Sequence, residues 1–73
     1  MTLGQTLKKA RIDRCLTQKR LGEIIGITPQ TISYYETDAK TPGLAALRKY
    51  CEALDLDPAE LAALKYGSEE DQD

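Results

Sequence analysis

The sequence contains no histidine, tryptophan or phenylalanine, and its only aromatic residues are four tyrosines. Without histidine, the chain cannot build a histidine-based catalytic triad or a histidine metal site, and it lacks the commonest general acid or base. No convergent pair of carboxylates and no cofactor motif is visible in the rest of the chain. We therefore expect a protein that is not an enzyme and that binds no metal and no cofactor.

Long apolar runs and cysteine clusters are missing as well. A membrane-spanning helix needs roughly 20 mainly apolar residues, and no stretch of the chain has that character. The first residues, Met1–Gln5, lack the basic and then apolar pattern of a secretory signal. Cys15 and Cys51 are too few and too far apart for a metal pattern. They could form a disulfide, but we favour two reduced thiols in the core or at its boundary, and hence a cytoplasmic protein with no membrane association.

Charge is distributed unevenly along the chain, although the net charge is only −2. Residues 1–20 carry six basic side chains and one acidic one, a balance of +5, whereas residues 49–73 carry two basic and eight acidic ones, a balance of −6. An acidic total is unusual for a protein that binds nucleic acid. A basic half joined to an acidic half is nevertheless expected of a domain with one face on nucleic acid. The alternative is that the charges only solvate the two ends.

Capping residues and apolar periodicity predict an all-α domain of five short helices, without strands. The chain has 73 residues, which suffices for one small domain. The residues that mark helix starts are Thr2, with Gln5 completing a capping box, then Thr17, Thr28 and Asp57, while Leu44, Leu47, Cys51 and Leu54 mark the remaining helix. We assign residues 1–66 to the domain and expect residues 67–73 to form a disordered acidic tail.

The segment Thr17–Glu36, which reads TQKRLGEIIGITPQTISYYE, has the form of two helices joined by a tight turn. Gly22 lies inside the first of these helices, where alanine would favour the helix by roughly 1 kcal/mol. We therefore infer that the two helices approach each other closely at Gly22. Gly26 lets the chain turn, Ile27 fills the angle between the helices, and Ile32 packs back onto the first helix. This pattern predicts a helix-turn-helix.

The same residues resemble the lambda-repressor-like, or Cro/XRE, family of DNA-binding proteins over residues 16–54. The resemblance is carried by Leu16-Thr17-Gln18, Leu21-Gly22, Gly26-Ile27-Thr28, Thr31-Ile32-Ser33, Glu36 and Pro42. Three residues depart from the family pattern, since Cys15 and Asp38 stand where the family usually has glycine and Gly22 stands where it usually has alanine. The resemblance implies a five-helix lambda-repressor-like fold with the helix-turn-helix at helices 2 and 3. The departures affect the expected loop geometry and not the expected DNA face.

Helical periodicity divides the second helix of the pair into an inner and an outer face. If Ile32 and Tyr35 point inward, the outer face carries Pro29, Gln30, Ser33, Tyr34 and Thr37. We expect four of these residues to contact bases in the major groove, namely Pro29, Gln30, Ser33 and Tyr34. Gln30 can bond adenine at N6 and N7, whereas Pro29 offers only apolar contact. The alternatives are a solvated Gln30, and a Tyr34 that contacts a partner protein or is half-buried.

Contacts to the DNA backbone need hydrogen-bond donors on both sides of that helix. The expected backbone contacts are Thr17, Gln18, Thr28, Thr37, Lys40 and Thr41. For Gln18 the family resemblance implies the same role. Arg14 and Lys19 could add long-range attraction or be ordinary solvated charges.

Arg11 and Glu36 are expected to act structurally. The resemblance implies a partly buried ion pair between these two positions, at the junction of the first and third helices. Arg11 could still present an edge to phosphate. Removing either partner would leave a buried charge unpaired and cost about 3 kcal/mol.

These observations favour a sequence-specific transcriptional regulator that binds double-stranded DNA. We expect a repressor that occupies a palindromic operator as a homodimer, with half-sites about one helical turn apart. The resemblance implies a dimer surface on the fifth helix at Leu61, Leu64 and Tyr66, and exposed Ile24 on the second helix is a rival surface. The alternative is a protein-interaction module or an antitoxin that binds a protein partner, with or without DNA binding.

Overall fold

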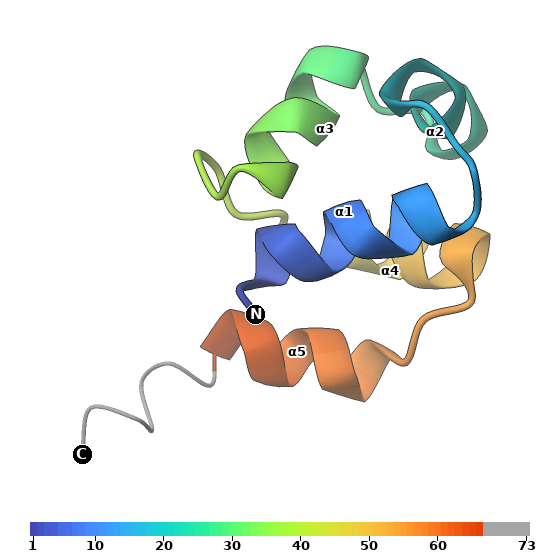
Figure 1. Ribbon diagram of the computed structural model, residues 1–73. Helices are drawn as coiled ribbons and strands as arrows, with labels where there is room; N and C mark the ends of the chain where they lie inside the picture. The colour runs from blue at the N-terminus through green and yellow to red at the C-terminus, as the bar shows by residue number, and fades with distance from the viewer. Residues whose placement is uncertain (67–73) are drawn as a thin grey trace.

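The computed structural model describes residues 1–66, which form five α-helices (Figure 1). The helices are α1 (Leu3–Asp13), α2 (Gln18–Ile25), α3 (Pro29–Glu36), α4 (Leu44–Leu54) and α5 (Pro58–Tyr66). The predicted all-α class is confirmed, and the described part of the chain contains no strand. None of its helices is long and apolar enough to cross a membrane. The acidic segment predicted to be a disordered tail, residues 67–73, lies outside the described residues.

Threonine side chains cap the first three helices, as the sequence predicts. Thr2 and Gln5 form a reciprocal capping box, in which the Thr2 Oγ1 accepts the Gln5 N–H at 3.1 Å and the Gln5 Oε1 accepts the Thr2 N–H at 2.9 Å. The hydroxyl oxygens of Thr17 and Thr28 each accept the N–H three residues further on, at 2.9 and 3.2 Å. Gly26 ends α2 in the left-handed conformation, with φ of 73°. Local chemistry therefore defines the boundaries of the helix-turn-helix.

Helix α1 packs against α3, α4 and α5, and α2 packs against α3 and α4 (Figure 1). The core takes side chains from all five helices, namely Leu3, Leu7, Ala10, Leu21, Ile25, Ile32, Leu47, Tyr50, Cys51, Leu54 and Leu61. Leu61 is only 1% exposed. It therefore packs in the core of the single chain, and the predicted dimer surface on α5 is left with Leu64 and Tyr66 as its accessible residues. Cys51 is buried as expected, but Cys15 is exposed, and both thiols are free.

Tyr50 is the largest fully buried side chain in the core. Its ring meets the ring of Tyr35 edge-on, with centroids 6.4 Å apart. Its hydroxyl has no hydrogen-bond partner among the described residues. Burial raises the pKa of the Tyr50 phenol well above its usual value, and the nearby Glu36 carboxylate raises it further. Among the described side chains, the Tyr50 hydroxyl is therefore a buried polar group without a hydrogen-bond partner.

The start of α1 is bonded to the loop that follows α3. Asp38 accepts the Gly4 N–H at 2.9 Å with one carboxylate oxygen and the Thr2 hydroxyl at 2.6 Å with the other. Asp38 adopts the left-handed conformation that the family's usual glycine would favour, with φ of 64°. A Cβ on Gly4 would lie 2.5 Å from the Tyr35 carbonyl oxygen. Only glycine therefore lets α1 approach the end of α3 this closely.

Gly22 also lies at a close approach, but its neighbour differs from the one expected. A Cβ at this position would overlap the carbonyl oxygen of Ile27 in the turn, whereas the Ile32 side chain of α3 would lie at an ordinary 3.5 Å. The same stretch is held together by backbone bonds, since the Gly22 carbonyl accepts the N–H groups of Gly26 and Ile27 at 2.8 and 3.1 Å. The small residue therefore accommodates the turn rather than the facing helix.

Candidate nucleic-acid interface

Helix α3 has the two faces that its periodicity predicts. Ile32 is completely buried and Tyr35 is half-buried, so these side chains attach the helix to the domain. On the other face, Ser33 and Tyr34 are half-buried and the remaining side chains are exposed, namely Pro29, Gln30 and Thr37. The face opposite Ile32 is therefore polar and open to solvent.

Three of the expected DNA-contacting residues lie together on this face. The Gln30 Nε2 donates to the Tyr34 hydroxyl at 2.8 Å. The Lys40 Nζ lies 4.8 Å from the centre of the Tyr34 ring, in a cation–π contact. The Lys40 backbone N–H also donates to the Tyr34 carbonyl at 3.2 Å. Tyr34 thus connects Gln30, in the first turn of α3, with Lys40, in the loop that follows α3.

Two of the threonines expected to contact phosphate already use their hydroxyl hydrogens within the protein. Thr28 donates to the Thr31 hydroxyl at 2.8 Å, and Thr37 donates to the Ser33 carbonyl at 3.0 Å. The Thr17 hydroxyl only accepts a bond, and it donates none to another described residue. Of these three threonines, Thr17 is therefore the one whose hydroxyl hydrogen is free for a phosphate oxygen.

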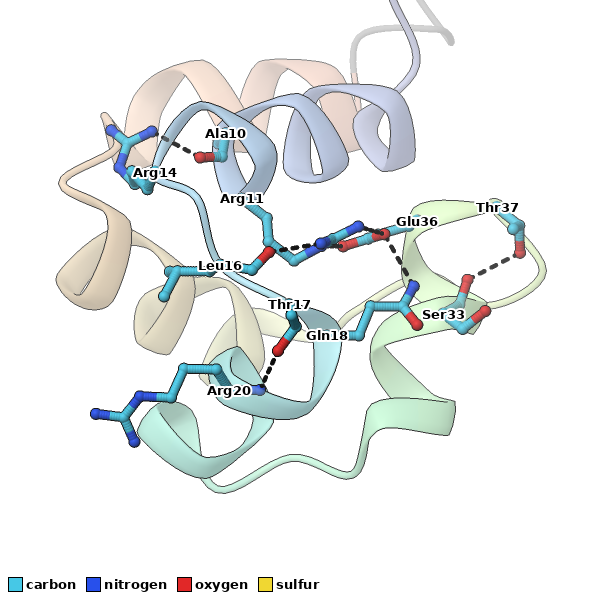
Figure 2. A network of polar contacts seen from close by, with 10 residues as sticks. All are labelled: Ala10, Arg11, Arg14, Leu16, Thr17, Gln18, Arg20, Ser33, Glu36 and Thr37. Atoms are coloured by element: carbon cyan, nitrogen blue, oxygen red, sulfur yellow. Dashed lines mark hydrogen bonds and ion pairs between the residues drawn. The ribbon is translucent and has the colours of Figure 1, made fainter.

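Gln18 lies at the first position of α2 and is half-buried. Its Nε2 donates to the Glu36 Oε1 at 3.1 Å, which orients the amide toward α3 (Figure 2). The second hydrogen of Nε2 stays available for a phosphate. Lys40 and Thr41, in the loop after α3, are both exposed.

Arg11 and Glu36 form an ion pair between α1 and α3 (Figure 2). The Arg11 Nε donates to the Glu36 Oε2 at 2.6 Å, and its Nη2 donates to the Oε1 at 3.1 Å. The Arg11 Nη1 donates to the Leu16 carbonyl at 2.7 Å, in the loop before α2. The two side chains are only 11% and 2% exposed. One guanidinium therefore ties α1, the loop before α2 and the end of α3 to one another, and Glu36 extends the network to Gln18.

The two surfaces predicted for a second copy each carry an exposed, largely apolar side chain. On α5, Leu64 is half-buried and Tyr66 is 50% exposed, with the Lys65 Nζ 5.3 Å from the Tyr66 ring centre. On α2, Ile24 is 46% exposed. It lines a shallow hollow of about 410 Å³ together with residues of α2 and α4, namely Ile25, Lys49, Glu52 and Ala53.

Sequence reasoning missed two features of this region. Asp38 was considered only as a substitute for glycine, although its carboxylate holds the start of α1 against the end of α3. The bond between Gln30 and Tyr34 was also missed, although their spacing of four residues on a helix is a usable signal.

Comparison with known proteins identifies the family. A family model described as helix-turn-helix matches residues 7–61. The structure resembles the P22 c2 repressor, solved in complex with synthetic operator 9T in the presence of Tl⁺, with a TM-score of 0.79 and 24% identity over 84% of this chain and 92% of that one. It also resembles a chain of the SinR–SinI protein complex, with a TM-score of 0.78 and 25% identity over 92% of this chain and 66% of that one. No curated protein sequence matches the chain significantly. The chain belongs to the lambda-repressor-like, or Cro/XRE, family of helix-turn-helix DNA-binding proteins.

Proposed function

We propose that this protein is a sequence-specific transcriptional repressor that acts by occupying operator DNA as a dimer. The observation that carries the proposal is the outer face of α3, where Gln30, Tyr34 and Lys40 gather opposite the buried Ile32. The c2 repressor, whose fold is similar, is bound to operator DNA in its solved structure.

In this mechanism α3 lies in the major groove and Gln30 bonds an adenine edge through its amide. Pro29 and Ser33, on the same helix, contact neighbouring bases. Backbone contacts come from residues on both sides of α3, namely Thr17, Gln18, Thr28, Thr37, Lys40 and Thr41. The hydroxyls of Thr28 and Thr37 must first break their hydrogen bonds within the protein before they can donate to phosphate. We therefore assign these two residues a smaller share of the affinity for DNA.

A dimer would place two copies of α3 in successive major grooves, about 34 Å apart. For its surface we propose the end of α5, where Tyr66 is half exposed beside Leu64. Ile24 on α2 is the rival surface. Measuring the molar mass of Tyr66→Glu and Ile24→Glu by sedimentation separates the two, since only the charge at the true surface should convert dimers to monomers.

Selection of bound sites from a random DNA pool tests the proposal. Gln30→Ala should relax the base preference at one position and cost about 1–3 kcal/mol of discrimination. Lys40→Ala should weaken binding to all sequences alike and lower the slope of affinity against salt by about 1. Arg48→Ala is a control, since Arg48 is an exposed basic residue on α4 outside the hollow at Ile24 and should leave that slope unchanged. A selected motif that is identical for the parent and Gln30→Ala would contradict this assignment of the recognition helix.

A second candidate function is the binding of a protein partner, with or without DNA, as in an antitoxin that binds its toxin. The hollow at Ile24 favours it, because an exposed isoleucine lines this hollow together with the charged side chains of Lys49 and Glu52. A chain of similar fold occurs in a protein complex, that of SinR with SinI. Salt dependence separates the candidates, because binding to DNA must weaken steeply as salt rises. Absence of retention on any DNA would favour the protein-binding function.

A further inference from the structure

We infer that Tyr34 is a positioning residue: its hydroxyl orients the Gln30 amide for adenine, and its ring holds Lys40 beside the DNA backbone. This inference rests on the proposed function and assigns Tyr34 a different role from direct base reading. The hydroxyl of Tyr34 would then affect base specificity, and its ring would affect the overall affinity for DNA.

The difference in burial between the two residues supports the first part. Gln30 is exposed at the second position of α3, and a free glutamine there samples many rotamers, whose loss on binding costs free energy. Tyr34 lies one turn further along and is half-buried, so its ring is constrained by its neighbours. The 2.8 Å bond from the Gln30 Nε2 to the Tyr34 hydroxyl restricts the amide before DNA arrives.

The count of hydrogens shows why this orientation suits adenine. The Gln30 Nε2 carries two hydrogens and uses one of them on Tyr34. The other N–H and the Oε1 stay free, and adenine presents the matching acceptor N7 and donor N6. Guanine presents two acceptors on the same edge, so its O6 would face the Oε1 without a hydrogen between them. The Tyr34 hydroxyl hydrogen can point away from Gln30, and this keeps an oxygen lone pair directed at the Nε2.

The ring of Tyr34 has its own contact. The Lys40 Nζ lies 4.8 Å from the ring centre, and the Lys40 backbone N–H is bonded to the Tyr34 carbonyl. The cation is thus held close to α3 instead of moving freely with the exposed loop. A phosphate that passes this end of α3 would meet a lysine whose position is already restricted, so less entropy is lost on binding.

Two substitutions at position 34 separate the hydroxyl from the ring. The DNA is the operator recovered by selection, with each of the four bases at the position that Gln30→Ala relaxes. Tyr34→Phe keeps the ring, so the salt slope should stay unchanged, whereas preference for adenine at that position should fall by about 2- to 10-fold. Tyr34→Ala also removes the support of Lys40, so affinity for all four sequences should fall in addition.

A double substitution shows whether Tyr34 acts through Gln30. In the Gln30→Ala background, Tyr34→Phe should cause no further change in base preference, and circular dichroism melting should show that all variants remain folded. A Tyr34→Phe effect that persists without Gln30, or that falls on another base position, would overturn the inference because Tyr34 would then read a base itself. An unchanged preference in Tyr34→Phe would overturn it too, while relaxation by Gln30→Ala would still uphold the proposed function.

Discussion

Removing the carboxylate of Glu36 should destabilise the domain more than the substitution of any exposed side chain. Glu36→Ala deletes the acceptor of two Arg11 bonds and leaves a guanidinium that is 11% exposed. That guanidinium keeps one described partner, the Leu16 carbonyl at 2.7 Å. Breaking one side of a buried ion pair costs about 3–5 kcal/mol, because the remaining charge stays desolvated. Since a chain of 73 residues has roughly 4–11 kcal/mol in total, this loss is a large part of the stability.

Urea denaturation followed by circular dichroism measures the effect. The urea concentration at the midpoint should fall strongly. The slope of the free energy of unfolding against urea concentration should stay constant, because the two-state transition still exposes the same surface. Asp13→Ala is a matched control, since it breaks an ion pair of 2.7 Å with Lys9 whose side chains are 61% and 54% exposed. That exposed pair should contribute less than about 0.5 kcal/mol.

The double substitution Arg11→Met with Glu36→Leu tests the physical reason. It removes both charges together and so leaves neither desolvated without a partner. The double variant should therefore be more stable than Glu36→Ala. A loss below about 1 kcal/mol in Glu36→Ala, or a double variant that is less stable than the single one, would refute the argument that desolvation of Arg11 dominates.

Three further predictions concern the rest of the fold. Tyr50→Phe removes a buried hydroxyl without a described partner and should raise the free energy of unfolding by about 1 kcal/mol. Because the pKa of Tyr50 is raised in the folded chain, ionisation of this phenol favours the unfolded chain above about pH 10. The free energy of unfolding should therefore fall less above that pH in the variant than in the parent. Gly22→Ala should cost about 1–3 kcal/mol through overlap with the Ile27 carbonyl, and a higher melting temperature would contradict the close approach. Asp38→Ala should lower the melting temperature by removing the acceptor of the Gly4 N–H. Asp38→Gly should recover only the part of the lost stability that comes from forcing alanine into the left-handed backbone conformation.

The helix boundaries could be predicted because their causes are local. A capping threonine bonds an N–H three residues away, so Thr2, Thr17 and Thr28 announce helix starts within a short window of sequence. Gly26 likewise ends α2 through its own backbone conformation. The inner face of α3 was predicted for a similar reason, since helical period alone separates buried from exposed positions.

Contacts between distant segments had no such signal. The bond between Gln18 and Glu36 spans 18 residues, and no spacing along the chain predicts it. The family resemblance implied a dimer surface at Leu61, and only the folded chain shows that this side chain lies in the core. Cys15 was expected near the core because of its residue type, yet its left-handed backbone, with φ of 57°, places it in an exposed turn.

The carboxylate of Asp38 also joins two helices into one unit of local unfolding. Because the Gly4 N–H is bonded to Asp38, its hydrogen can exchange with solvent only after the start of α1 has separated from the end of α3. The exchange rate of this one amide therefore reports how firmly α3 is attached to the rest of the domain. DNA that stabilises the attached arrangement would slow exchange at Gly4, a residue that belongs to α1 and not to α3, the helix that we propose lies in the groove.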